Sequence, residues 1–237
     1  MKNSHDRVNV IAIDGPAGSG KSTIAKMLAK RLGLNYIDTG ATYRAVTLLA
    51  LDNNIEPDDE KAVLKLLKGA SIELECNPED TDRYTMVILN GKDVTDRIRG
   101  AEVGKAVSVV SKLPGIRKYL VRLQRKLAEN GKKASVLEGR DIGSVVFPDA
   151  ILKVYLDADI DERVKRRQLQ NISKGNPSSK TSVKNEITAR DSIDSSRKDS
   201  PLLVPEGAVV IDSTDLSIEN VFEKIRELYY EKIRTEN

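Results

Sequence analysis

Short apolar runs alternate with longer amphipathic segments along most of the chain. The segments between the runs repeat apolar residues every three or four positions, as helices do when one face is buried. The runs have the length and the Val, Ile and Leu content of buried strands, and they cover residues 8–13, 34–38, 134–139, 151–157 and 208–213. Strands alternating with helices predict an α/β fold with a five-stranded parallel sheet flanked by helices on both faces.

One region interrupts this alternation. Residues 71–98 contain "SIELEC", "RYTMVIL" and "KDVTDRI", which alternate apolar and polar side chains and are separated by the turn segments "NPEDTD" and "NG". This pattern predicts a small antiparallel insertion. Further along, "RDIGSVVFPDA" (140–150) is predicted to be a loop because of its turn residues and glycine. Two charged helices are expected at 159–175 and 182–196.

Composition narrows the class of protein. The 237 residues fit one domain, and 39 basic against 36 acidic residues give a net charge of only +3, which does not favour nucleic acid as a partner. The single cysteine, Cys76, excludes an intramolecular disulfide and a cysteine-rich metal site, and it favours a reducing compartment. No apolar stretch is long enough to span a membrane. We therefore expect a cytoplasmic chain with no membrane partner, in which His5 of the polar leader plays no acid–base role.

The clearest motif is "GPAGSGKST", which lies between the first strand and a helix. It matches G-x-x-x-x-G-K-[ST] in the context that a P-loop requires, where glycines let backbone N–H groups turn toward an anion at a helix N-terminus. Lys21 would reach the β- and γ-phosphates, and the Ser22 hydroxyl would bind Mg²⁺. The motif predicts a P-loop NTPase fold with an ATP site formed by Gly15, Pro16, Ala17, Gly18, Ser19, Gly20, Lys21, Ser22 and Thr23. A glycine-rich turn with an incidental lysine is the alternative interpretation.

Two segments that follow buried strands carry candidate contacts to a second anion. "DTGATYR" places Thr39 and Arg44 at the carboxyl edge of the sheet, where ligands of α/β folds bind. The alternative for this pair is a helix cap followed by a solvated arginine. "EGRDIGS" places Arg140 and Asp141 at the same edge. Arg140 could bind phosphate and Asp141 could accept from an exocyclic amine, unless the segment is a plain surface turn.

Two helical segments carry further cations. "ARDSIDSSR" aligns Arg190, Asp194 and Arg197 on one helical stripe, although on its own such a stripe is more typical of a solvated ion-pair face. "DERVKRRQLQ" carries Arg163, Arg166 and Arg167, which are candidates for a mobile cationic flap that closes over ATP. A solvated helix face explains these three equally well.

One acidic residue opens the P-loop. Asp14 follows the first apolar run directly. It could orient the acceptor phosphate through water, or it could simply structure the turn, and the sequence favours neither role over the other.

Taken together, these segments resemble the bacterial cytidylate kinases, which are nucleoside monophosphate kinases. The resemblance runs from about Val8 to the last helix through "IDGPAGSGKST", "DTGATYR", "EGRDIGSVVFPDA", "KVYLDAD", "ARDSIDSSR" and "VVIDSTDLSIENV". It implies the reaction ATP + CMP → ADP + CDP, with dCMP as a second acceptor and Mg²⁺ as cofactor. It also implies one kinase domain over 1–237, with a core (8–38, 131–158, 205–237), a CMP-binding region containing the insertion (39–130) and a helical lid (159–204).

The resemblance also implies residue roles. Thr39 and Asp141 would recognise the cytosine or ribose side of the acceptor. Arginines would hold the CMP phosphate, namely Arg44, Arg117 and Arg140, with Arg99 nearby. Arg190 and Asp194 would contact the sugar, and Arg197 would join them or turn toward phosphate. Lys21, Arg140 and Arg190 are the expected catalytic residues, and Arg163 and Arg167 join the P-loop in binding ATP.

Two other functions fit parts of the sequence. A kinase for another small acceptor, such as UMP or shikimate, would share the P-loop and differ in the residues around Asp141. A regulatory or RNA-associated P-loop protein would bind nucleotide without phosphorylating a small molecule, and it would retain nucleic acid in a strongly salt-dependent way. The expected partners are ATP and CMP or dCMP, bound by a monomer.

Overall fold

The computed structural model describes residues 9–77, 80, 83–130, 133–173, 175 and 177–236. His5 lies outside these residues. The core is a parallel sheet in the order β2-β6-β1-β7-β8. Its strands are β1 (Val10–Asp14), β2 (Asn35–Asp38), β6 (Ser135–Gly139), β7 (Leu152–Asp157) and β8 (Val209–Asp212). All five strands predicted from the apolar runs are therefore present, and the predicted α/β fold with a five-stranded parallel sheet is confirmed.

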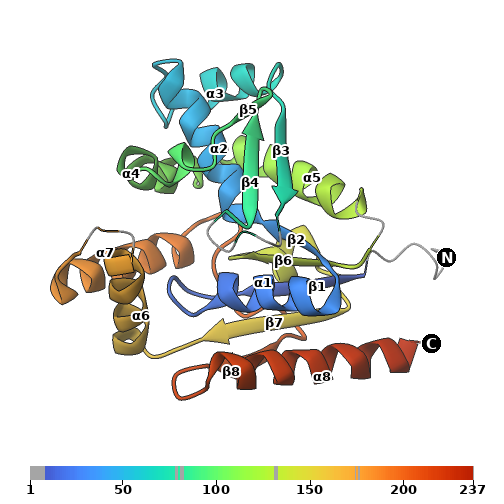
Figure 1. The fold of residues 1–237 in the computed structure, drawn as a ribbon. Coiled ribbons are helices and arrows are strands. Elements are labelled where there is room, and N and C mark those ends of the chain that lie inside the picture. The colour runs from blue at the N-terminus through green and yellow to red at the C-terminus, as the bar shows by residue number, and fades with distance from the viewer. Residues whose placement is uncertain are drawn as a thin grey trace.

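Alternation along β1 explains why both faces of the sheet are covered. Ile11 and Ile13 pack on one face against α1 (Lys21–Leu32) and α8 (Ile218–Glu236). Val10 and Ala12 pack on the other face, beside residues of α5 (Pro114–Glu129). Figure 1 shows α8 running along the lower side of the core beside β7 and β8. Because both faces are apolar, every residue of β1 is buried.

The region between β2 and β6 forms a separate lobe, shown at the top of Figure 1. A second hydrophobic core holds this lobe together. It contains an antiparallel sheet in the order β3-β4-β5, as the alternating pattern predicts. Its elements, besides α5, are α2 (Thr39–Asp52), α3 (Glu60–Leu67), β3 (Ile72–Cys76), β4 (Thr85–Leu89), β5 (Lys92–Asp93), a 3₁₀ turn (Arg97–Arg99) and α4 (Ala101–Val110). Residues 78, 79, 81 and 82 of the predicted turn lie outside the described residues.

The third strand predicted in this lobe is shorter than expected. The segment 92–98 is extended only at Lys92–Asp93 and then turns into the 3₁₀ helix. The Asp93 carboxylate accepts from the Thr95 N–H at 2.9 Å, and the Thr95 hydroxyl accepts from the Val87 N–H at 2.9 Å. These side chains replace the backbone partners that would continue the ladder, and the strand therefore ends.

The predicted loop after β6 is in fact partly helical. Ile142–Val146 form a π-helical turn, labelled η2. Two side chains stabilise it: the Asp14 carboxylate accepts from the Ile142 and Gly143 N–H groups at 2.7 Å each, and Arg125 donates to the carbonyls of Val145 and Val146. Each of these partners is remote in sequence, so the local pattern gives no sign of the turn.

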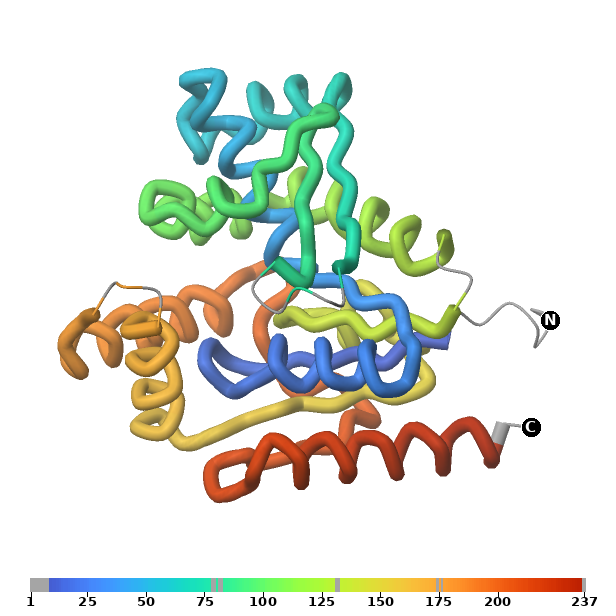
Figure 2. Tube along the Cα trace, in the orientation of Figure 1, coloured from blue at the N-terminus to red at the C-terminus, as the bar shows by residue number. Residues whose placement is uncertain are grey.

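Helices α6 (Ile160–Ser173) and α7 (Lys180–Ser195) pack against each other as a pair. Their contact is a small apolar cluster of Val164, Val183 and Ile187. Figures 1 and 2 show the pair at the left of the molecule, beyond the ends of β1 and β7 and below the lobe. Among the described residues, no helix has the length and apolar character needed to cross a bilayer.

Candidate active site

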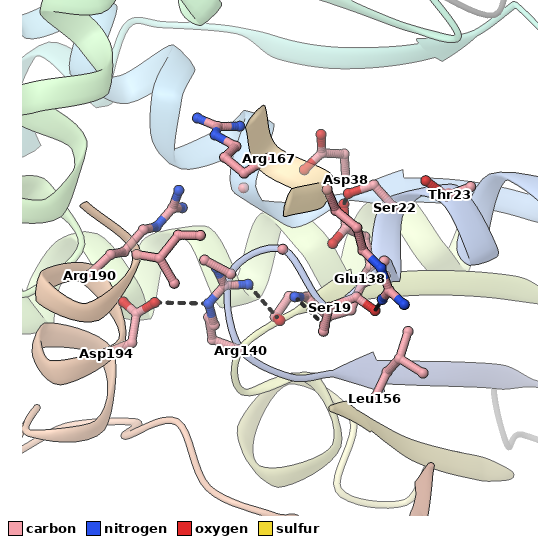
Figure 3. Close-up of a pocket in the computed structure, with 18 of the residues that line it drawn as sticks. Ser19, Ser22, Thr23, Asp38, Glu138, Arg140, Leu156, Arg167, Arg190 and Asp194 are labelled. Carbon is pink, nitrogen blue, oxygen red and sulfur yellow. Dashed lines mark hydrogen bonds and ion pairs between the residues drawn. The ribbon is translucent and has the colours of Figure 1, made fainter. Parts of the chain in front are cut away.

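A cavity of about 780 Å³ lies at the carboxyl ends of the parallel strands. Its lining comes from the P-loop side of the core, from α2, α4 and α5 of the lobe, and from α6 and α7. Figure 3 shows Arg190 and Asp194 on the α7 side of this cavity, with Ser22, Asp38 and Glu138 on the opposite side. Ligands of open α/β sheets bind at this edge, and the cavity is the candidate active site.

The P-loop connects β1 to α1 and curls around its own lysine. Gly15 has φ +149°, and a Cβ there would lie 2.1 Å from the Leu156 carbonyl oxygen of β7, so only glycine fits. The Lys21 ammonium donates to the Pro16 carbonyl at 2.6 Å and to the Ser19 hydroxyl at 3.4 Å. The loop therefore places a buried cation at the start of α1, where the helix dipole adds positive potential.

Lys21 shares the cavity with two arginines. Burial, together with the charges of Arg140 and Arg190, lowers the pKa of Lys21 from its ordinary value of 10.5 to about 7. Burial and the charge of Arg140 likewise lower the pKa of Arg190 to about 10. Three cationic side chains, from the segment after β6, from α7 and from the P-loop, therefore converge on one partly dehydrated region. Such a cluster favours the binding of an anion that offsets its mutual repulsion.

Two carboxylates that the sequence reasoning missed face the P-loop serine. The Ser22 hydroxyl donates to Glu138 at 2.6 Å, and the Tyr36 hydroxyl donates to the same Glu138 oxygen at 3.2 Å. Burial and the charge of Glu138 raise the pKa of Asp38 to about 6. Both acids lie at the ends of apolar runs, in "VLEG" and "YID". This position at the edge of the sheet is the sequence signal that could have identified them as site residues.

These oxygen groups fit a hard divalent cation. Mg²⁺ is usually held by one or two carboxylates together with substrate phosphates and water. Ser22, Glu138 and Asp38 provide such oxygens next to the P-loop. The described part of the chain contains no group of three or more His, Cys, Asp or Glu side chains able to hold a metal by themselves. A cation here would therefore complete its coordination with phosphate oxygens and water.

The lobe side of the cavity carries a buried ion pair. The Arg117 guanidinium binds the Asp141 carboxylate, donates to the Ser111 carbonyl at 3.0 Å and lies 5.3 Å from the centre of the Tyr43 ring. Both charged side chains are almost fully buried. A planar guanidinium between a carboxylate and an aromatic ring presents fixed donors and acceptors, which suits recognition of a flat polar ring. Tyr43 and Ser111 were not singled out from the sequence.

The predicted stripe faces the cavity and not solvent, although α7 ends at Ser195 and Arg197 lies just beyond the helix. Asp194 is 2% exposed and accepts from Arg140 at 2.8 Å, a contact drawn as a dashed line in Figure 3. Its other oxygen accepts from Arg197, which also donates to the Ser111 hydroxyl at 2.9 Å. The interpretation as a solvated ion-pair face is thus wrong for this helix. Asp194 instead links α7 to the segment that follows β6 and, through Arg197, to Ser111 just beyond the end of α4.

Nearly all of the predicted site residues line one cavity. These are Ala17, Gly18, Ser19, Gly20, Lys21, Ser22, Thr23, Thr39, Arg44, Arg99, Arg117, Arg140, Asp141, Arg167, Arg190, Asp194 and Arg197. Gly15 and Pro16 are not among its lining residues and form the base of the loop. Arg166, the third member of the α6 cluster, lines the cavity and donates to the Ser213 carbonyl at 2.7 Å.

Two predicted residues are placed differently from the expectation. Arg163, expected to contact ATP, does not line the cavity: its guanidinium donates to the Ala17 carbonyl at 3.1 Å and binds the Asp191 carboxylate. Asp14 is fully buried and accepts from two N–H groups of η2. Asp14 therefore structures a turn, as one of its two expected roles has it, but that turn is η2 and not the P-loop that Asp14 opens.

Comparison with known proteins identifies close relatives of the chain. A family model described as cytidylate kinase matches residues 11–231. A cytidylate kinase of Geobacillus sp. (strain WCH70) is 49% identical over 223 residues, covering 94% of this chain and 97% of its own length. A cytidylate kinase of Caldanaerobacter subterraneus subsp. tengcongensis is 49% identical over 224 residues, covering 94% of each chain. Among solved structures, a gluconokinase from Sinorhizobium meliloti 1021 is 13% identical, with a TM-score of 0.43 over 96% of this chain and 93% of its own.

Proposed function

The chain belongs to the cytidylate kinase family and is an ATP-dependent phosphotransferase that converts CMP to CDP, and on that premise we propose roles for the residues of its cavity. The reaction requires two phosphorylated substrates held in line, with the charge on the moving phosphoryl group neutralised. A cavity at the sheet edge with a P-loop on one side and arginines from the lobe and α7 on the other supports this assignment.

The convergence of Lys21, Arg140 and Arg190 is the observation that carries the proposal. The charges of Arg140 and Arg190 both disfavour protonation of Lys21, so an anion placed among the three would be strongly attracted. We assign this position to the phosphoryl group in transit. Positive groups already fixed around the developing charge stabilise the transition state without further reorganisation. Phosphoryl transfer then requires no side-chain nucleophile.

ATP is assigned to the P-loop side. The backbone N–H groups of the loop and Lys21 would bind its β- and γ-phosphates, and Arg167 of α6 would approach from the opposite wall. Residues 159–204, which include α6 and α7, are proposed to act as a lid that limits access of water to the γ-phosphate. The loop residues of the proposal are Gly15, Pro16, Ala17, Gly18, Ser19, Gly20, Ser22 and Thr23.

CMP is assigned to the lobe side. The Thr39 hydroxyl donates to the Glu138 carbonyl at 2.7 Å, which leaves its oxygen to accept from a ligand. Asp141 is also an acceptor, whereas Arg117 beside it is a donor. Cytosine presents an amino donor beside a ring-nitrogen acceptor, so this arrangement favours cytosine over uracil. Phosphate and sugar contacts are assigned to Arg44, Arg99, Arg140, Arg190, Asp194 and Arg197.

Mg²⁺ is proposed as the metal of the ATP subsite. Ser22, Glu138 and Asp38 would hold it, directly or through water, and when bound it would neutralise charge on the phosphate oxygens. The Ser22 hydroxyl already points at Glu138, so these residues need no rearrangement of the fold to share a cation. Two further properties are proposed on the family resemblance alone. They are action on dCMP and a monomeric state.

An acceptor panel tests these assignments. ADP formation from ATP and Mg²⁺ should be measured with CMP, dCMP, UMP, AMP, GMP and shikimate for the wild type and for Asp141→Asn. The wild type should prefer CMP and dCMP. Asp141→Asn removes the charge that fixes Arg117, so kcat/KM for CMP should fall about 100-fold while KM for ATP changes little.

Asp149→Asn is the matched control, because Asp149 lies exposed in the same segment. It should retain the wild-type acceptor profile. Equal use of CMP and UMP by the wild type, or an Asp141→Asn enzyme with unchanged kcat/KM for CMP, would contradict the proposed base contacts and leave the kinase activity intact.

A further inference from the structure

The P-loop contacts the helical pair through two residues, Arg163 and Asp191, that do not line the cavity. The Ala17 N–H donates to Asp191 Oδ1 at 3.0 Å, and the Ala17 carbonyl accepts from Arg163 Nη1 at 3.1 Å. The same guanidinium nitrogen donates to the other oxygen of Asp191. Both polar backbone groups of one P-loop residue are thus bound by an ion pair that joins α6 to α7. Arg163 Nε is itself fixed on the Ala158 carbonyl at 3.0 Å.

Packing reinforces this contact. The Ala17 side chain packs against the apolar cluster of Val164, Val183 and Ile187 that holds the helical pair together. A Cβ at Gly18 would lie 3.1 Å from the Arg163 carbonyl oxygen and 3.2 Å from the Arg163 Cβ, so α6 lies directly against the loop. The side chains of Arg163 and Asp191 are only 11% and 18% exposed. Their interaction is therefore less weakened by solvent than that of a surface ion pair.

The direction of the loop's polar groups explains why such a contact matters. A loop that turns its N–H groups toward a phosphate directs carbonyls outward, and these carbonyls need donors. Arg163 supplies one for Ala17. The Ala17 N–H points outward as well, toward Asp191, so the groups available to phosphate begin at Gly18. Because both backbone groups of Ala17 are held, the position at which this set of N–H groups begins is held as well.

We propose that Asp191 and Arg163 are positioning residues that clamp Ala17, so that the helical pair holds the P-loop in the conformation that binds the phosphates of ATP. The proposal rests on the kinase function and concerns its ATP subsite. Neither residue touches the substrate. Their effect is on ATP and not on CMP, because the clamp lies on the P-loop and the lobe takes no part in it.

If Asp191 hindered ATP binding instead of supporting it, the effect of removing its charge on KM for ATP would differ in sign. Asp191 is an anion bound to a P-loop N–H, and it could instead compete with ATP phosphate for the loop. If it competed, removing its charge would tighten ATP binding. If it positions the loop, removing its charge weakens ATP binding. The sign of the change in KM for ATP therefore separates the two roles.

The test compares Asp191→Asn, Arg163→Lys and the double variant with the wild type. Asparagine keeps an oxygen for the Ala17 N–H but loses the charge that binds Arg163, and lysine keeps the charge of Arg163 but not its fork of donors. Each single variant should raise KM for ATP about tenfold, the loss typical of one charge-assisted hydrogen bond. KM for CMP should stay within about twofold. The double variant should be no worse than either single one, because both remove the same clamp.

The matched control is Asp161→Asn. Asp161 is on α6, is 56% exposed and pairs with Lys184 and Lys180 on α7, so it links the same two helices without contacting the loop. It should keep wild-type kinetics. Hydrogen exchange of residues 15–20 in the ligand-free protein provides a readout independent of turnover, and Asp191→Asn should accelerate it whereas Asp161→Asn should not.

The results separate the clamp from the proposed function. Unchanged loop exchange with unchanged KM for ATP, a fall in KM for ATP, or an equal rise in both KM values would overturn the clamp. Failure of the wild type to phosphorylate CMP would contradict the proposed function instead, and loop exchange would still report on the clamp.

Discussion

Lys21 shows how much of the site's chemistry is set by the surroundings of one side chain. It is 5% exposed, and the charges of Arg140 and Arg190 act on it in the same direction as burial does. A protein gains no stability from bringing buried like charges together. This cluster of cations is explained if a phosphate binds among them, because the ligand then supplies the missing negative charge.

The lowered pKa of Lys21 makes the stability of the ligand-free protein depend on pH. The folded pKa is about 7, below the ordinary value of 10.5, so charging Lys21 destabilises the fold fully below about pH 7 and progressively less as pH rises toward 10. Lys21→Met lacks this penalty. The difference in unfolding free energy, Lys21→Met minus wild type, should therefore fall by about 2 kcal/mol between pH 7 and 9.

Urea denaturation at several pH values measures this difference. The other titrating groups are shared by both proteins and largely cancel in the subtraction. Lys30→Met, an exposed position on the same helix, should show no such trend. A pH-independent difference for Lys21→Met would mean that the lysine is not held at a lowered pKa.

At the scale of elements, the π-helical turn η2 determines where the charges proposed to bind the acceptor lie. Arg140 and Asp141 come directly before it, and its N–H groups are held by the Asp14 carboxylate at the end of β1. One buried acid thus connects the strand that leads into the P-loop with the segment that carries the proposed CMP contacts. Irregular helical turns of this kind are often found at functional sites.

Asp14→Asn should destabilise the protein and impair CMP use together. An asparagine can accept from only one of the two N–H groups and presents its own donor to the other, which leaves a buried group unpaired. We expect a loss of about 1–3 kcal/mol in unfolding free energy and a rise in KM for CMP. Urea denaturation and steady-state kinetics measure the two effects. Asp149→Asn, beyond the far end of the turn, should show neither, and a stable Asp14→Asn enzyme with normal CMP kinetics would refute this role.

The sequence predicted best those elements whose cause is local. The five apolar runs became the five parallel strands, because a run of Val, Ile and Leu is buried wherever a sheet is covered on both faces. The P-loop is likewise specified by its own residues. By contrast, η2 depends on Asp14 and Arg125, and the short β5 depends on a hydroxyl of Thr95 that reaches across to β4. Such long-range side-chain bonds leave no periodic trace in the sequence.

The same limit applies to the site residues. The arginines in segments that follow strands could be predicted as site residues, because cations at the edge of a sheet need an anion to offset their charge. Glu138 and Asp38 were missed because an acid at the end of a strand is also an ordinary helix cap, and Asp38 does cap α2. The function of Arg163 could not be read from α6 alone, since its partner Asp191 lies on α7 and its target is a backbone carbonyl.

The whole molecule arranges three parts around one concentrated charge. The core contributes Lys21, the lobe contributes arginines such as Arg117, and α7 contributes Arg190, while the chain as a whole carries a net charge of only +3. The cavity thus gathers cationic side chains although the chain as a whole is nearly neutral, which suits a small anionic ligand better than a long polyanion.

The turnover number of Lys21→Met tests the central claim most directly. It should be measured with ATP, Mg²⁺ and CMP at saturating concentrations, beside the wild type and Lys30→Met. If Lys21 stabilises the phosphoryl group in transit, kcat falls at least about 100-fold while the fold and the Lys30→Met activity are kept. A Lys21→Met enzyme whose kcat stays within about threefold of the wild type would contradict the assignment of the cationic cluster as the place where phosphoryl transfer occurs.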